Sequence, residues 1–209
     1  MATDSRPIPP AEVLRNVRAD PWHGPEIVAL AAAEYHAPMA RRWHAEVTAR
    51  YDYEGAHLAR MATAKHATLA RFGGAAMGFG GLLTMLPDIV GLAWIQSRLV
   101  FYIAAAYGFD PADPMRPAEL LVLQRVYEDP GEARKALDLE GKALAAKLIE
   151  KSVHGEGATI ERLTRMVGSR AGKRLAGKAI PGFAVLFNAY SNEKETRKLA
   201  RHAMRFYGG

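Results

Sequence analysis

The feature of this chain that most limits its fold is a long segment, residues 72–108, in which Asp88 and Arg98 are the sole charged residues. Its first part, residues 72–87, contains sixteen uncharged residues, five of them glycine, and ends at Pro87. Sixteen helical residues span about 24 Å, whereas a membrane-crossing helix needs about 20 residues. A longer span would place the Asp88 carboxylate in lipid beside a helix-breaking proline. We therefore expect a helical hairpin inside a protein core.

The rest of the chain also indicates helices. Alanine is the commonest residue, and no stretch alternates polar and apolar residues with the period of two that is typical of strands. A chain of 209 residues suits one domain with a sizeable core. We predict an all-α fold, a single-domain helical bundle around the apolar Gly-rich helical hairpin (72–108), with other helices near 25–35, 38–52, 56–72, 117–128, 132–154 and 181–207.

The N-terminal part has a different composition. Five prolines fall within the first 25 residues, which predicts a Pro-rich N-terminal arm over 1–25 with one short helix at 11–18, followed by a helical domain over 26–209. The opening residues lack the apolar run of a secretory signal, so we expect a cytoplasmic protein, with a location at the inner face of the membrane as the open alternative. The absence of cysteine excludes disulfides, thiol nucleophiles and cysteine metal sites.

The helix that starts at Pro87 carries a candidate ligand-binding stripe. At about 100° per residue, Asp88, Ile95, Arg98 and Tyr102 share one arc, and the other faces are apolar. Asp88 and Arg98 are about 15 Å apart along the helix and cannot pair with each other. The stripe therefore predicts a pocket whose polar groups hold the headgroup of a ligand and whose apolar walls hold its tail.

A structural alternative exists for both charges. Asp88 caps a helix or pairs with Lys65 or Arg71, and Arg98 binds a helix C-terminus, because buried charges in helical bundles are usually paired. Whether the interior around Tyr102 is hollow or filled distinguishes the two interpretations.

The positive charge of the chain is concentrated at its C-terminal end. From Glu161 onward there are eleven Lys and Arg residues against three acids, a net charge of +8, while the rest of the chain carries −2. The last helix has a thin apolar strip of Leu199, Ala203 and Phe206. Either this strip packs on the domain and the charge faces water, or the helix lies on an anionic membrane surface. The candidate contact residues are Lys194, Arg197, Lys198, Arg201 and Arg205.

No known catalytic or metal-binding motif is complete. Residues 172–179 differ by one residue from a phosphate-binding loop, but Ala179 replaces the hydroxyl residue and no strand precedes it. The seven histidines form no zinc motif, and no serine lies in a nucleophile elbow. We therefore expect no catalytic residue, metal or cofactor. Nucleic acid is not an expected partner, because no known nucleic-acid-binding fold accompanies the basic charge.

Two stretches, residues 65–111 and 172–207, resemble the EcsC family. The features that carry the resemblance are the glycine-rich apolar run, the Pro-Asp that opens a helix, the Gln-x-Arg within it and the Tyr-Gly-x-Asp at its end. The family takes its name from a protein encoded beside two components of an ABC transporter. The resemblance thus implies a membrane-transporter context and provides no catalytic residue to assign.

Three functional hypotheses follow. The first is non-enzymatic binding of a lipid or other amphiphile, or peripheral docking on an anionic membrane surface. The second is a protein–protein adaptor or accessory protein of a membrane transporter. The third is an enzyme that acts on a hydrophobic substrate around Asp88 and Arg98.

Overall fold

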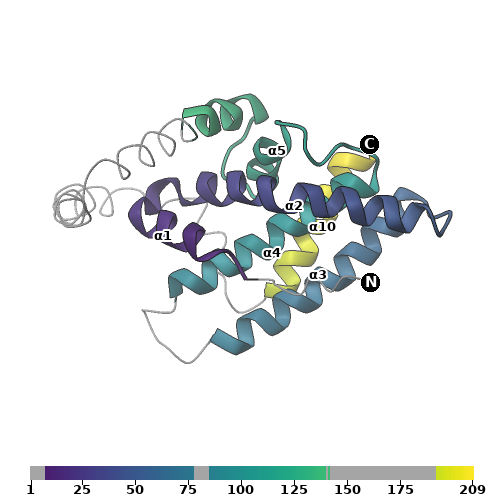
Figure 1. Ribbon diagram of the computed structural model, residues 1–209, viewed down its shortest axis with the longest axis horizontal. Coiled ribbons are helices and arrows are strands. Elements are labelled where there is room, and N and C mark those ends of the chain that lie inside the picture. The colour runs from purple at the N-terminus through teal and green to yellow at the C-terminus, as the bar shows by residue number, and fades with distance from the viewer. Residues whose placement is uncertain (1–7, 78–84, 140, 142–191) are drawn as a thin grey trace.

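A computed structural model of the chain describes residues 8–77, 85–139, 141 and 192–209 (Figure 1). These residues form helices and no strand, which confirms the predicted all-α fold. The helices are α1 (Ala11–Ala19), the 3-10 helix η1 (Pro21–His23), α2 (Gly24–Thr48), α3 (Gly55–Met77), α4 (Met85–Ala106), α5 (Arg116–Leu123) and α10 (Asn192–Gly208). Residues 130–139 are also helical.

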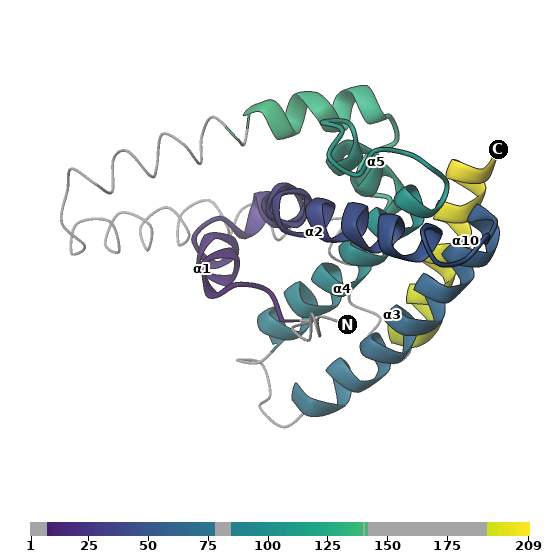
Figure 2. The same ribbon diagram turned by 45° about the vertical axis from the view of Figure 1, so that its right-hand side comes forward.

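Helix α4 is the centre of the fold. It contacts α2, α3 and α10, and Figures 1 and 2 show it lying among these three helices. Every residue from Val90 to Ala106 is buried. A helix that is apolar on most faces needs neighbours on most faces, so the described part of the apolar segment is buried in protein as expected. The turn of the expected hairpin falls at 78–84, outside the described residues.

The start of α3 lies against the end of α4, so the two helices run antiparallel. A Cβ atom on Gly55 would be 2.8 Å from the carbonyl oxygen of Ala106 and 3.2 Å from the Tyr107 ring. A side chain at this position would therefore clash, because the two backbones approach closely there, and glycine fits. Gly208, at the end of α10, lies against the same ring, where a Cβ would be 3.1 Å away. Helices α4 and α10 therefore end at the same end of the bundle.

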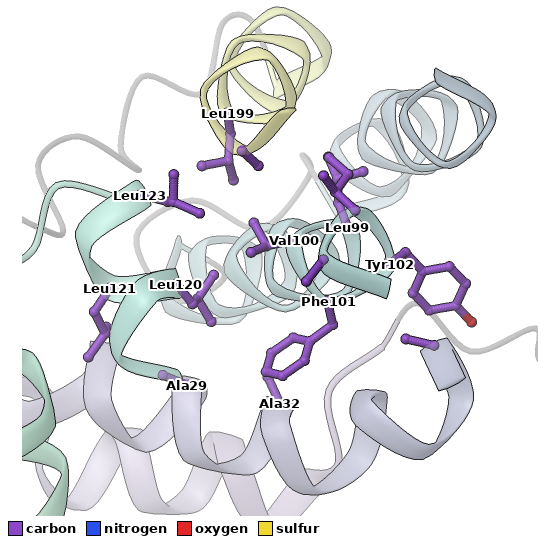
Figure 3. Close-up of a cluster of buried hydrophobic side chains, with 14 of the residues drawn as sticks. Ala29, Ala32, Leu99, Val100, Phe101, Tyr102, Leu120, Leu121, Leu123 and Leu199 are labelled. Carbon is purple, nitrogen blue, oxygen red and sulfur yellow. The ribbon is translucent and has the colours of Figure 1, made fainter. Parts of the chain in front are cut away.

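The core between α2, α4, α5 and α10 contains large side chains of one helix against small ones of another (Figure 3). Phe101 of α4 points toward Ala32 of α2, whose small side chain lets the helices approach. Leu199 of α10 faces Leu123 of α5. Burial of each large apolar side chain contributes about 1.5–3 kcal/mol, so these contacts hold α10 on the body.

The predicted short helix at 11–18 is confirmed as α1. Its Val13 and Val17 are buried in the same core cluster as α2. Residues 25–35 and 38–52, expected as two segments that Pro38 separates or kinks, form the single helix α2, which continues through this proline. Pro38 and Glu34 are both exposed, so water can bond the Glu34 carbonyl that the proline leaves without its helical donor.

Helix α5 is shorter than the predicted 117–128 and ends at Leu123. Arg125 has a left-handed backbone with φ of 62°. The amide of Val126 donates to the Leu121 carbonyl, and that of Arg125 to the Val122 carbonyl, both at 2.9 Å. These two bonds make a Schellman motif, a helix ending that usually has glycine where Arg125 stands. The sequence showed no glycine here, so the helix end was not predicted.

Helix α10 is fastened to α5 by a group of partly buried polar side chains. The Tyr207 hydroxyl donates to Glu119 Oε2 at 2.7 Å, and the Arg116 guanidinium donates to the same carboxylate and to Asp113. Burial raises the pKa of Glu119, while its bonds to Tyr207 and Arg116 oppose this rise. The guanidinium also lies 5.6 Å from the centre of the Tyr207 ring. The cluster sets the position of the last turn of α10.

Candidate functional site

Helices α2, α3 and α4 bring five polar or aromatic residues together inside the bundle. His36 of α2 and His66 of α3 are fully buried, and Arg98 of α4 is 2% exposed. The His36 ring lies 4.4 Å from that of Trp94, and the His66 ring lies 5.1 Å from that of Tyr102. We call His36, His66, Trp94, Arg98 and Tyr102 the buried polar cluster.

Arg98 and Tyr102 are one helical turn apart and contact each other. The Arg98 guanidinium donates to the Tyr102 hydroxyl at 3.4 Å and lies 5.3 Å from the centre of its ring. Two members of the predicted stripe, Arg98 and Tyr102, therefore lie in contact. Ile95 packs instead with Ala70 and Leu92 in a separate apolar cluster. The side chain of Asp88 lies outside the described part of the structure, so the predicted role of the complete stripe stays a prediction.

Both buried histidines are neutral. Burial lowers the pKa of His36 to about 3, and the nearby charge of Arg98 lowers it further. Burial also lowers the pKa of His66 to about 3, although its bond to the Ala62 carbonyl opposes part of the change. The His66 Nδ1–H donates to that carbonyl at 2.7 Å, because a carbonyl can only accept. His66 Nε2 is thus a hydrogen-bond acceptor.

Several nitrogen atoms of the cluster have no hydrogen-bond partner in the described part of the structure. They are His66 Nε2, Trp94 Nε1 and one ring nitrogen of His36, whose ring also interacts with the Trp94 backbone. Buried polar atoms are normally satisfied, and each unsatisfied one costs about 1–3 kcal/mol. The cluster thus offers donors and an acceptor that a water molecule or a polar group of a ligand can use.

The described residues contain no group of three His, Cys, Asp or Glu side chains arranged to hold a metal ion. The third hypothesis, an enzyme around Asp88 and Arg98, requires the Asp88 carboxyl in a cavity, which lies outside what the structure describes. Sequence reasoning missed His36, His66 and Trp94, because it tested the histidines only for metal-ligand spacing. The sequence contained a weaker indication that these histidines are buried, since each lies among alanines on a helix with buried positions nearby.

The second candidate site is the outer face of α10. Its inner face is buried at Thr196, Leu199, Ala203 and Tyr207, which follow each other at helical spacing. The apolar strip therefore packs on the domain, except for Phe206, which is 45% exposed. All five predicted contact residues are exposed, and we call them the basic face of α10: Lys194, Arg197, Lys198, Arg201 and Arg205.

Two members of the basic face have acidic neighbours on the same helix. Arg197 donates to Glu193 Oε1 at 2.9 Å, and Lys198 lies 3.9 Å from Glu195. Lys194, Arg201 and Arg205 make no ion pair with any residue that the structure describes. Such exposed intrahelical pairs contribute about 0.3–0.5 kcal/mol, so they restrain the two side chains only weakly.

These features define an all-helical protein whose central apolar helix is enclosed by α2, α3 and α10. The model of the EcsC protein family matches residues 53–208, and the chain therefore belongs to this family. The match covers α3, α4, α5 and α10, whereas α1, α2 and His36 precede it. Comparison with curated proteins and comparison with solved structures gave no match.

Within the described ranges, every helix is too short or too polar to cross a membrane. Helix α4 has enough residues to be considered, since it runs from Met85 to Ala106. It contains Asp88 and Arg98, and its described side chains from Val90 onward are buried against other helices.

Proposed function

We propose that the protein docks peripherally on anionic membrane surfaces through the basic face of α10. The observation that carries the proposal is that all five basic side chains are exposed on one face, while buried residues of the opposite face fasten the helix to the body. The charge is therefore presented by a supported helix and does not depend on a helix forming at the membrane. Contact of this kind is electrostatic, because the apolar strip is already used in the core.

The expected strength follows from the number of accessible charges. Each Lys or Arg near an anionic bilayer contributes about 1 kcal/mol. Lys194, Arg201 and Arg205, which have no ion pair among the described residues, then contribute about 3 kcal/mol together. This corresponds to a change of more than a hundredfold in the binding constant.

Phe206 supports the same orientation. Its exposed ring is next to Arg205, and it makes an edge contact with the Tyr207 ring at 5.0 Å. An exposed aromatic side chain next to an arginine suits the headgroup region of a bilayer, where one end of the ring is apolar and the surroundings are wet.

The experiment compares two triple variants of equal net charge. The test variant changes Lys194, Arg201 and Arg205 to Gln. The control variant changes Arg15, Arg18 and Arg42 to Gln; these residues are exposed on α1 and α2. Circular dichroism and urea unfolding check that both variants fold. Binding is measured by co-sedimentation with vesicles of phosphatidylcholine and phosphatidylglycerol, and with vesicles of phosphatidylcholine alone, at low and at physiological salt.

The proposal predicts binding to the anionic vesicles that weakens as salt increases, because salt screens exposed charges. The α10 variant loses at least tenfold in binding, whereas the control variant stays near the unmodified protein. Equal losses in the two variants would mean that net charge alone causes binding. That outcome, or no binding to anionic vesicles at low salt, would overturn the proposal.

A second candidate function rests on the buried polar cluster. The unpartnered nitrogens of His36, His66 and Trp94 lie among apolar and aromatic walls, which suits the polar end of an amphiphile. Solvent extraction and native mass spectrometry of the purified protein test this candidate. Recovery of a stoichiometric amphiphile, lost on changing His66 to Leu in a folded variant, supports it. Recovery of none from the folded unmodified protein contradicts it.

A further inference from the structure

A small polar pocket lies where the end of α5 meets α10. Its volume is about 50 Å³, which is room for roughly four water molecules. Leu123 and Leu199 form its apolar part. The polar lining comes from three segments of the chain, namely α4, the end of α5 and α10: Gln96, Gln124, Arg125, Glu195, Lys198 and His202.

One of the two buried amide groups that line the pocket, that of Gln124, has a donor without a partner among the described residues. Gln96 is 3% exposed and Gln124 is 8% exposed, although both line the pocket. Gln124 Nε2 has no hydrogen-bond partner in the described part of the structure. An amide nitrogen can only donate, so the missing partner is a hydrogen-bond acceptor.

Positive charge surrounds this donor. Arg125 and Lys198 line the pocket, and Arg201 and Arg205 lie close enough to act on His202. Burial lowers the pKa of His202, and the four cations Arg205, Arg125, Lys198 and Arg201 lower it further. Against them stands one carboxylate in the lining, that of Glu195, which lies 3.9 Å from Lys198. The balance favours an anion as the acceptor.

The backbone of Arg125 costs stability. A left-handed conformation costs a residue with a Cβ about 1 kcal/mol relative to glycine. The Schellman motif at this position would normally use glycine. Residues held in such conformations are common at ligand-binding sites, where position matters more than stability. Here the strained residue provides one of the two cations in the pocket lining.

We propose that this pocket binds a phosphomonoester group. A tetrahedral dianion can accept bonds from the guanidinium of Arg125, the ammonium of Lys198 and the amide of Gln124 at once, since its oxygens point in different directions. A singly charged planar carboxylate would match fewer of these donors. The proposal goes beyond membrane docking, because it concerns one group in a pocket, whereas docking uses the summed charge of the basic face.

The soluble arm of the test uses glycerol 1-phosphate, with glycerol and sodium chloride at matched ionic strength as ligand controls. Binding is followed by isothermal titration calorimetry and by the NMR shifts of the His202 ring. Lys198→Gln and Arg125→Gly each weaken binding about tenfold, because each removes a charge-assisted bond. Lys135→Gln, an exposed change on the helix at 130–139, serves as the charge control and leaves binding unaltered.

Two variants, Arg125→Gly and Glu195→Gln, are expected to change binding in ways that a defect in folding cannot produce. Arg125→Gly relieves the left-handed strain, so it keeps or raises the urea midpoint while it weakens phosphate binding. Glu195→Gln removes the carboxylate that competes for Lys198, so it tightens binding several-fold. Weaker or unchanged binding by Glu195→Gln would overturn the assignment of Lys198.

The vesicle arm distinguishes a lipid headgroup from a free ligand. Phosphatidic acid carries a phosphomonoester and phosphatidylglycerol a diester, so vesicles of the two lipids are compared at matched surface charge. A preference for phosphatidic acid that is lost in Arg125→Gly supports a lipid source, and binding of glycerol 1-phosphate alone supports a soluble source. If neither arm depends on Arg125 and Lys198, the proposal is overturned, even if docking through the basic face persists. Conversely, phosphate binding without docking would overturn only the docking proposal.

Discussion

The neutrality of His36 and His66 makes the stability of this protein depend on pH. Both side chains are fully buried, and their pKa values in the folded protein are lowered from 6.5 to about 3, mainly by burial. The unfolded chain binds these protons near pH 6.5, whereas the folded protein does not. These two histidines therefore leave the free energy of unfolding undiminished above pH 6.5. They lower it progressively as the pH falls from 6.5 toward 3.

The size of the effect follows from this difference. One pH unit below 6.5, each histidine lowers the free energy of unfolding by about 1.4 kcal/mol, since a difference of one pKa unit corresponds to that free energy. The two together cost about 3 kcal/mol between pH values of roughly 7.5 and 5.5. The free energy of unfolding of an ordinary domain is about 5–15 kcal/mol, so this loss is a large part of the total.

The measurement is urea unfolding, followed by circular dichroism, at the two pH values. The double variant His36→Gln with His66→Gln removes the two groups, so its free energy of unfolding changes by at least about 2 kcal/mol less than that of the unmodified protein. His57→Gln is the control, because His57 is exposed and stacks on Tyr53. A double variant that loses as much stability on acidification as the unmodified protein would refute the reasoning.

Three further changes test the packing by urea unfolding. Tyr207→Phe removes the hydroxyl that donates to Glu119, and we expect a loss of about 1–2 kcal/mol, with no loss if the bond is absent. Gly55→Ala places a Cβ against the Ala106 carbonyl and is expected to cost about 1–3 kcal/mol; a neutral result would contradict the close approach of α3 and α4. Leu120→Ala empties a fully buried position and is expected to cost about 2–5 kcal/mol, whereas an exposed leucine would cost little.

The adaptor hypothesis and the cytoplasmic location remain predictions from the sequence. The division into an arm over 1–25 and a helical domain over 26–209 has the same standing, although α1 packs on α2 through Val13 and Val17. Residues 142–191 contain part of the basic C-terminal quarter and lie outside the described residues.

The helices and the orientation of their faces could be predicted from local patterns. The apolar segment had to be buried because one charge from Val90 to Ala106 leaves no polar face for water. The apolar strip of α10 followed from its helical spacing, since apolar residues recur every three or four positions, although Phe206 of that strip is exposed in the structure. These properties depend on neighbours in the sequence, and the sequence therefore determined them.

The two sites depend on contacts between distant segments, and only the tertiary structure decided them. His36, His66 and Arg98 lie about thirty residues apart, and no local pattern states that α2 and α3 place both histidines beside the same arginine. The pocket likewise needs the end of α5 beside α10, and it depends on Arg125 taking a backbone conformation that sequence rules reserve for glycine. Packing free energy spread over many residues selected these arrangements against the local preference of a single one.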